Sequence, residues 1–198
     1  WKLDEGKGLV AADASGHKLD GALKGGVAWT NAAGRKALSF DGAGGIVEMP
    51  TKLEDLAVPF SFTFWVNPAA EQVEYADILG NHAGPMGLVM QQEQNKTNLF
   101  GFGYGDGAKW YQAGLAQLTA HEWQHVAVVC GDGKSVCYVN GVEKSSGAGS
   151  GVFAPNPNLT FRLGQGYGAK RFFKGLLNDV RIYRTALSAS DVQAVMKE

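Results

Sequence analysis

A period-two alternation of apolar and polar residues constrains this chain more than any other feature of its sequence. The segment Phe60–Val66 reads FSFTFWV, which places three phenylalanines and Val66 on one side of an extended strand. Ser61, Thr63 and Trp65 then fall on the other side. Similar short segments recur along the 198 residues, separated by glycine, asparagine or aspartate clusters. This pattern predicts many short strands joined by tight turns.

The other segments with this alternation predict further strands at Val27–Thr30, Ala37–Phe40, Ile46–Met49, Ala76–Leu79, Gly87–Gln91, Asn98–Phe102, Trp110–Ala113, Trp123–Cys130, Val136–Val139, Leu159–Leu163 and Leu176–Tyr183. So many short strands imply an all-β fold in which two antiparallel sheets form a sandwich. Asn140-Gly141 is typical of a type I′ hairpin turn, because both residues accept positive φ.

One short helix is predicted near the C-terminal end of the sequence. Ser188 and Asp191 have the spacing of a capping box, and Ala189, Val192 and Val195 then share one helical face. We expect this helix to pack across an end of the sandwich.

Composition supports a single β domain. The chain has 28 glycines and only 19% charged residues, which disfavours disorder, a coiled coil or a helical bundle. The segment Ser145–Gly151 could pass for a linker, but its ends run into strand patterns, so we interpret it as a mobile loop. We therefore expect one domain over residues 1–198, taken from a larger protein because the sequence starts abruptly.

Charge and hydropathy exclude several classes of partner. Eighteen basic and 19 acidic residues leave a net charge of −1, which provides no overall attraction to nucleic acid or anionic lipid. Apolar runs such as Val126–Cys130 are far shorter than the ~20 residues of a membrane span. Two formal glycosylation acceptors, at Asn95 and Asn158, are given no role because the motif is common by chance. Cys130 and Cys137 flank a predicted hairpin turn and form either a disulfide or two buried thiols.

Several phrases occur together in one order along the chain. They are Trp1-x-Leu-Asp-Glu-Gly, Asp13-x-Ser-Gly, Ala37-Leu-x-Phe-Asp-Gly, Trp123-x-His-Val-Ala, Tyr138-Val-Asn-Gly and Gly175-x-Leu-Asn-Asp-Val-Arg-Ile-Tyr. In these the sequence resembles the LamG-like jelly-roll domains of the concanavalin A-like lectin/glucanase superfamily. The resemblance implies two stacked antiparallel sheets. It also implies a module that is often accessory to secreted bacterial enzymes or adhesins, is frequently carbohydrate-binding, and often holds a structural calcium ion.

The resemblance implies a position for calcium, which takes six to eight oxygen ligands. The matching positions are Asp41, Asn178 and Asp179, and Asp4, Glu5 and Asp13 could complete the shell. The alternative is that Asp13 and Asp41 only cap turns through their own backbone.

Catalytic signatures are weak. His121 and His125 match the HExxH zinc pattern, but that pattern needs a helix, and the apolar run after His125 predicts a strand in which the two would stand ~13 Å apart. The carboxylate run of the superfamily's glucanases is missing, and Glu48, Glu71 and Glu93 are interpreted as surface charges. We expect no catalytic residues. An unrecognised glycosidase or polysaccharide lyase stays open as an alternative, with carboxylates assembled from distant segments.

Carbohydrate recognition needs exposed aromatic faces and planar polar groups. The richest segments are Phe100–Tyr111 and Gly166–Phe173, which interleave aromatics with glycines. The candidate carbohydrate-binding residues are Tyr104, Trp110, Tyr111, Tyr167, His82 and Asp106, to which Asn81 and Lys109 could add hydrogen bonds. Tyr104 and Tyr167 are expected in exposed loops, and one of Trp110 and Tyr111 is expected to face outward. The alternative is that these rings fill the mouth of the sandwich.

These observations predict a noncatalytic, lectin-like module of a secreted or cell-surface bacterial protein. Its partners would be an uncharged glycan and other domains of the same protein. A protein-interaction or spacer module is the alternative, and it would show an exposed apolar patch and no sugar-width cleft.

Overall fold

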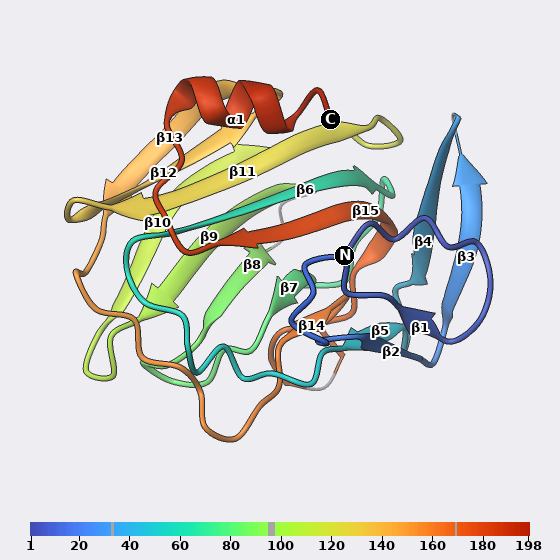
Figure 1. Cartoon of the computed structure of the whole chain (residues 1–198), viewed down its shortest axis with the longest axis horizontal. Coiled ribbons are helices and arrows are strands. Elements are labelled where there is room, and N and C mark those ends of the chain that lie inside the picture. Colours follow the sequence, from blue (N-terminus) through green and yellow to red (C-terminus); the bar gives the residue numbers. More distant parts are fainter. Residues whose placement is uncertain (33, 95–97, 169) are drawn as a thin grey trace.

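The computed structural model describes residues 1–32, 34–94, 98–168 and 170–198. Over these ranges two antiparallel sheets pack face to face, with one short helix near the C-terminal end (Figure 1). This confirms the predicted all-β sandwich. The glycosylation acceptor at Asn95 lies outside the described residues. No helix in the described ranges is long and apolar enough to cross a membrane.

Within the described ranges, one sheet has eight strands in the order β1-β2-β5-β14-β7-β8-β9-β10. These are β1 (Val10–Ala11), β2 (Gly21–Lys24), β5 (Ile46–Glu48), β14 (Arg162–Leu163), β7 (Asp77–Gly80), β8 (Leu88–Gln92), β9 (Leu99–Gly105) and β10 (Trp110–Gln117). The other sheet has seven strands among the residues that the structure describes, in the order β13-β12-β11-β6-β15-β4-β3. These are β13 (Val142–Ala148), β12 (Lys134–Val139), β11 (Gln124–Gly131), β6 (Phe60–Pro68), β15 (Lys174–Tyr183), β4 (Arg35–Asp41) and β3 (Val27–Ala32).

The core lies between the two sheets and is rich in phenylalanine. Phe60, Phe62 and Phe64 of β6 are each at most 1% exposed, as the alternation predicts. They face β9 across the sandwich, where the Phe62 and Phe102 ring centroids are 6.2 Å apart. Each buried aromatic removes a large apolar area from water, so these rings supply much of the free energy of folding.

The helix α1 (Ala189–Val195) begins with the predicted capping box. Its position is not the predicted one. Val192 packs against Ala127 and Val129 of β11, so the helix covers the outer face of the seven-stranded sheet and not an end of the sandwich (Figure 1). The reason is that β11 is apolar on both faces, and its outer face has to be removed from water by another element.

The hairpin between β12 and β13 has φ of 51° at Asn140 and 74° at Gly141, as the predicted turn requires. The interpretation of Ser145–Gly151 as a mobile loop is wrong in its first half, because β13 continues to Ala148 in register with β12. Hydroxyl and glycine residues suit this edge, where Ser145 Oγ donates a hydrogen bond to Leu115 O of β10 (2.7 Å) and ties the two sheets together.

Cys130 and Cys137 are free thiols, buried in the core on neighbouring strands. The register pairs Cys130 with Ser135 and Cys137 with Val128, so the two cysteines are not directly opposite one another. Burial raises the pKa of each thiol to about 12.

Candidate functional site

The outer face of the eight-stranded sheet carries a stripe of glycine where β9 passes. The predicted loop around Tyr104 is in fact this strand, in which aromatics point into the core and glycines point outward. Tyr104 is 0% exposed, and its hydroxyl donates to Ser150 O and accepts from Ser150 N. The prediction that Tyr104 is a surface residue is therefore wrong. Glycine and aromatic residues alternate here with the same period of two as in β6.

Trp110, at the start of the edge strand β10, lies over the outward glycines. A Cβ built at Gly103 would stand 2.5 Å from Cζ2 of the Trp110 indole. Any side chain at position 103 would displace this ring, so glycine is what lets the indole lie close to the sheet. Trp110 is half-buried and faces outward.

Four further side chains continue from Trp110, and we call the five together the aromatic row: Trp110, His82, Tyr167, Arg171 and Tyr75. Ring centroids are 4.1 Å apart between Trp110 and His82 and 4.9 Å apart between His82 and Tyr167. The Arg171 guanidinium then lies 4.6 Å from the Tyr167 ring and 4.8 Å from the Tyr75 ring. Tyr167 is 37% exposed and the other four are half-buried, so one flank of the row meets solvent.

A buried carboxyl holds the middle of the row in place. Asp77 Oδ2 accepts hydrogen bonds from the backbone N–H groups of Gly166 (3.0 Å) and Tyr167 (2.8 Å). Its Oδ1 accepts from Gln91 Nε2. Burial raises the pKa of Asp77 to about 7, although these hydrogen bonds and the charge of Arg171 act in the opposite direction. Asp77 thus fixes the backbone that carries Tyr167.

His82 lies between the Trp110 and Tyr167 rings. Its Nε2 lies 3.0 Å from Gly84 O, which fits an Nε2–H donor and leaves Nδ1 as the acceptor nitrogen. Burial lowers the pKa of His82, and the charge of Arg171 acts in the same direction. A neutral imidazole therefore stands between Trp110 and Tyr167, and such a ring stacks without bringing a charge to the row.

Of the candidate carbohydrate-binding residues, the structure brings together Trp110, His82 and Tyr167. Tyr111 lies elsewhere, stacked on Tyr104 with centroids 5.9 Å apart and packed against the core. Asp106 caps the β9–β10 turn through the backbone N–H groups of residues 108 and 109. The other two polar candidates lie outside the row as well. Asn81 is buried and hydrogen-bonded to backbone, and the Lys109 ammonium lies over the Tyr111 ring.

Sequence reasoning missed Tyr75 and Arg171. Arg171 belongs to one of the glycine-aromatic segments singled out above, but its partner Tyr75 lies far away in sequence, before β7. Asp77 N donates to Arg171 O (2.9 Å), and this pairing along β7 is what brings the two together. No local sequence motif predicts a contact between residues so far apart in the chain.

The residues expected to bind calcium do not form one ligand set. Asp41 Oδ1 accepts from three successive backbone N–H groups, those of residues 43–45, which is the turn-capping alternative. The register places Asp41 opposite Lys174, four residues before Asn178.

The other two expected ligands are also engaged within the chain. Asn178 donates to two backbone carbonyls and accepts from Arg35, and Asp179 pairs with Arg181 and Lys2. In the part of the chain that the structure describes, no three histidine, cysteine or acidic side chains gather as a metal group. The residues present do not fit the implied calcium site.

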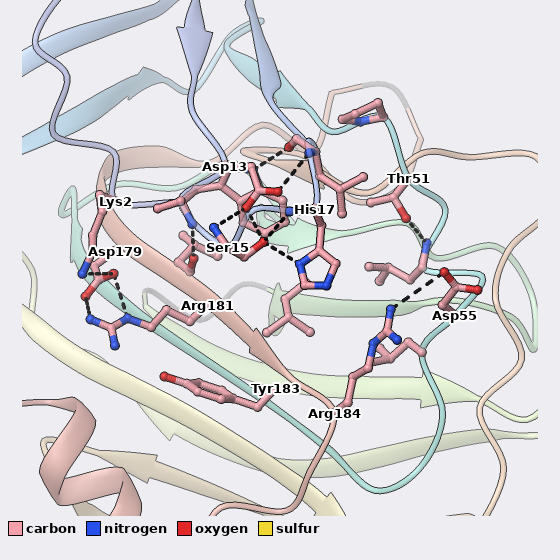
Figure 2. A pocket seen from close by; sticks show the side chains of 18 of the residues that line it. Lys2, Asp13, Ser15, His17, Thr51, Asp55, Asp179, Arg181, Tyr183 and Arg184 are labelled. Atoms are coloured by element: carbon pink, nitrogen blue, oxygen red, sulfur yellow. Dashed lines mark hydrogen bonds and ion pairs between the residues drawn. The ribbon is translucent and has the colours of Figure 1, made fainter.

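A pocket of about 550 Å³ lies elsewhere, beside the outer end of β15 (Figure 2). The pairing of β15 with β4 ends at Leu177. Beyond that point the backbone of residues 1–2 forms hydrogen bonds with Asp179 and Val180 of β15. Figure 2 shows Asp13, Ser15 and His17 across the pocket from Tyr183 and Arg184.

The carboxylates of this pocket are engaged by the chain itself. Asp13 accepts hydrogen bonds from Ser15 and from Leu19 N. Burial is the largest single effect on its pKa and raises it, but these hydrogen bonds together outweigh burial and lower the pKa to about 2. Ser15 Oγ stands between Asp13 Oδ1 (2.5 Å) and His17 Nδ1 (2.8 Å). In serine hydrolases the histidine stands between the other two groups, so this arrangement is no nucleophile relay.

The HExxH segment is not helical. His121 has a φ of 62° in a turn, and His125 is in β11, buried beside the Trp65 ring at 5.4 Å. Burial lowers the pKa of His125 to about 4. The two histidines therefore lack the helical face that the zinc pattern needs, and the prediction of a strand start here is confirmed.

A family model described as the Concanavalin A-like lectin/glucanases superfamily, laminin G type 3, matches residues 41–193. The chain belongs to this laminin G family. Among curated proteins this laminin G domain is 26% identical over 172 residues to Adhesion G-protein coupled receptor V1 of Danio rerio. The match covers 81% of the domain but only 3% of that receptor.

Solved structures share the fold of this laminin G domain. Domain 4 of AbnA, a GH43 extracellular arabinanase from Geobacillus stearothermophilus in complex with arabinotriose, matches with a TM-score of 0.73 at 23% identity, over 92% of this chain and 91% of that one. The binding domain of botulinum neurotoxin DC in complex with SialylT matches with a TM-score of 0.72 at 14% identity, over 93% and 47%. The binding domain of Paraclostridial Mosquitocidal Protein 1 matches with a TM-score of 0.73 at 16% identity, over 93% and 48%.

Proposed function

We propose that this laminin G domain is a noncatalytic glycan-binding module and that sugar rings stack on the aromatic row. The observation that carries the proposal is the contact series Trp110–His82–Tyr167, in which three rings from three separate segments meet on the outer face of one sheet. Rings that only filled a core would be buried, whereas Tyr167 is 37% exposed. An aromatic face with one side in solvent suits the apolar side of a sugar ring.

Polar groups beside the row support the same function. Gln112 lies two residues after Trp110 on β10, and its Nε2 donates to Glu93 Oε1 (2.6 Å) next to the outward Gly101. These planar amide and carboxylate groups can hydrogen-bond sugar hydroxyls. Two of the similar structures are complexes, one with arabinotriose and one with SialylT. The arabinotriose complex agrees with a module of this fold that holds a saccharide, since the match spans 91% of that chain.

The acid–base properties of the carboxyl groups favour binding over hydrolysis. A glycosidase needs a carboxylic acid of raised pKa that faces its substrate. In the pocket of Figure 2, the pKa values of Asp13 and Asp179 are lowered. Burial is the largest single effect and raises both values, but hydrogen bonds and nearby charges together outweigh it. Asp77 has a raised pKa, but it is buried and hydrogen-bonded to backbone. Neither the pocket nor the surroundings of Asp77 therefore offers a general acid together with a second carboxylate that would act as nucleophile or base.

The proposal includes a setting. The domain would act in a secreted or cell-surface protein and increase the local concentration of a neighbouring domain's substrate or receptor. The AbnA domain belongs to an extracellular arabinanase and another similar structure is the binding domain of a neurotoxin, which agrees with this setting.

Glycan binding can be tested by affinity electrophoresis through gels that contain plant, bacterial or animal polysaccharides, followed by calorimetry on any ligand that retards migration. Trp110→Ala should weaken binding about 5- to 150-fold, because one stacking contact on an aromatic ring contributes about 1–3 kcal/mol. Gly103→Ala should also weaken binding, because its Cβ would force the indole away from the sheet.

Two control variants separate binding from folding. Trp123→Ala removes another half-buried tryptophan, on the seven-stranded sheet, and Gly44→Ala adds a Cβ where no atom lies within 4 Å. Both should keep the wild-type affinity, and thermal melts should show each variant folded. Wild-type protein that is not retarded by any glycan, or a folded Trp110→Ala with unchanged affinity, would contradict the proposal.

A further inference from the structure

Arg171 is the one cationic member of the aromatic row, and its charge is not matched by the chain. The guanidinium contacts the Tyr75 and Tyr167 rings at 4.8 Å and 4.6 Å. Among the described residues no carboxylate lies within ion-pair distance of Arg171, and no oxygen accepts a hydrogen bond from its side chain. Other half-buried arginines of the chain differ, since Arg162 pairs with Glu48 and Arg181 with Asp179.

The charge of Arg171 acts on the buried carboxyl of Asp77, but that carboxyl does not satisfy the guanidinium. The charge of Arg171 lowers the pKa of Asp77, but burial has the larger and opposite effect. Both oxygens of Asp77 are occupied, Oδ2 by two backbone N–H groups and Oδ1 by Gln91. The five N–H donors of the guanidinium are therefore left for water or for a ligand.

The guanidinium is also held in place. Asp77 N donates to Arg171 O, and two residues later Phe173 N donates to Gly164 O (2.9 Å). The Phe173 side chain is 0% exposed in the core, so the backbone on this side of Arg171 is anchored. Two tyrosine rings then restrict the side chain. A rigid planar donor fork loses little entropy when it binds a planar anion.

We infer that the glycan bound by this domain carries a carboxylate, as a uronic or sialic acid does, and that Arg171 binds it while a ring of the same saccharide stacks on Tyr167 and His82. This inference rests on the proposed function and specifies its ligand class. Arginine pairs with carboxylates through two parallel N–H···O hydrogen bonds, which adds geometric selectivity to the charge. The near-zero net charge by itself favours an uncharged glycan, but the positive charge of Arg171 at the site favours an anionic one.

Matched ligand pairs test the inference. The probes are polygalacturonate against its methyl ester, glucuronoxylan against arabinoxylan, sialyllactose against lactose, and dextran sulfate against dextran. For at least one of the first three pairs, wild-type protein should bind the carboxylate form about 10–100-fold more tightly, as expected for two charge-assisted hydrogen bonds. Arg171→Gln should remove this preference and keep the residual affinity for the neutral form.

The variants distinguish a specific contact from general charge. Lys170→Gln removes the exposed neighbouring cation and should leave the preference intact, while Arg171→Lys should restore only part of it because lysine lacks the planar fork. Equal affinity for both forms, a preference that survives Arg171→Gln, or a stronger preference for dextran sulfate would overturn the inference. If neutral glycans still bind and Trp110→Ala abolishes that binding, the proposed function stands without it. If no probe binds, the proposed function itself fails.

Discussion

Asp77 is a single buried carboxyl with a direct effect on stability. Its pKa is about 7 in the folded protein, against about 3.9 in an unfolded chain, so the folded state retains a proton that the unfolded state loses. This stabilisation is fully present below about pH 4 and is lost as the pH rises through 7. Asp77→Asn should remove it, and an amide can still accept from the backbone at residues 166 and 167.

The measurement is urea unfolding at intervals between pH 4 and pH 8. The difference in free energy of unfolding between wild type and Asp77→Asn should fall with rising pH, by at most about 1.4 kcal/mol per unit, and level off above pH 7. Asp106→Asn is the control, because hydrogen bonds lower the pKa of that exposed carboxyl, so its titration lies below this window. Parallel curves for wild type and Asp77→Asn would show that the carboxyl is ionised throughout.

Tyr104 and Tyr167 show how far single residues could be predicted. Both stand between glycines in the sequence, yet Tyr104 is 0% and Tyr167 37% exposed. The prediction for Tyr104 is wrong because it ends the strand at Phe102, although the alternation continues to Gly105 and, applied over that whole segment, places Tyr104 in the core. For Tyr167 the deciding contact is non-local, since Asp77 holds its backbone from another strand. Neighbouring sequence does not encode that contact.

At the scale of elements, α1 depends on Ser188, the residue that caps its N-terminus. Ser188 Oγ accepts from Asp191 N (3.1 Å), and the Asp191 carboxylate accepts from Ser188 N (2.9 Å). Ser188→Ala should lower the free energy of unfolding by about 1 kcal/mol, the usual cost of losing such a cap. Urea unfolding measures this.

Gln193→Ala is the control, since Gln193 is an exposed residue inside the helix and makes no contact with the cap, and it should change the free energy of unfolding by under about 0.5 kcal/mol. Neither change should alter glycan affinity, because α1 lies on the seven-stranded sheet and the aromatic row on the eight-stranded one. Equal losses of stability from the two variants would show that the capping hydrogen bonds contribute nothing specific.

Elements that carry their own signal were predicted, and those that depend on a partner were not. The capping box and the Asn140-Gly141 turn are local, and both are confirmed. β13 has no apolar alternation, and its strand state comes from pairing with β12 and from the contact of Ser145 with β10. The docking of α1 likewise depends on the apolar outer face of β11, which the helix sequence does not reveal.

For the whole molecule, the fold class followed from the sequence while the candidate site followed only in pieces. Trp110, His82 and Tyr167 were each named, but their meeting depends on the strand order β14-β7-β8-β9-β10. The same kind of long-range register separates Asp41 from Asn178 by placing Asp41 opposite Lys174. A resemblance in motifs predicts which strands exist, and pairing decides which side chains become neighbours.

The two core thiols are internal probes of how often the sandwich opens. Cys130 and Cys137 lie between the sheets with pKa values raised to about 12 by burial, so they can react with a disulfide reagent such as DTNB only when the sandwich opens. Their labelling rate therefore reports how often the sheets separate. When opening is a fast equilibrium, a saturating glycan at 100 times its Kd should slow labelling about 100-fold. An unlabelled, unmodified chain thus carries its own assay for whichever sugar it binds.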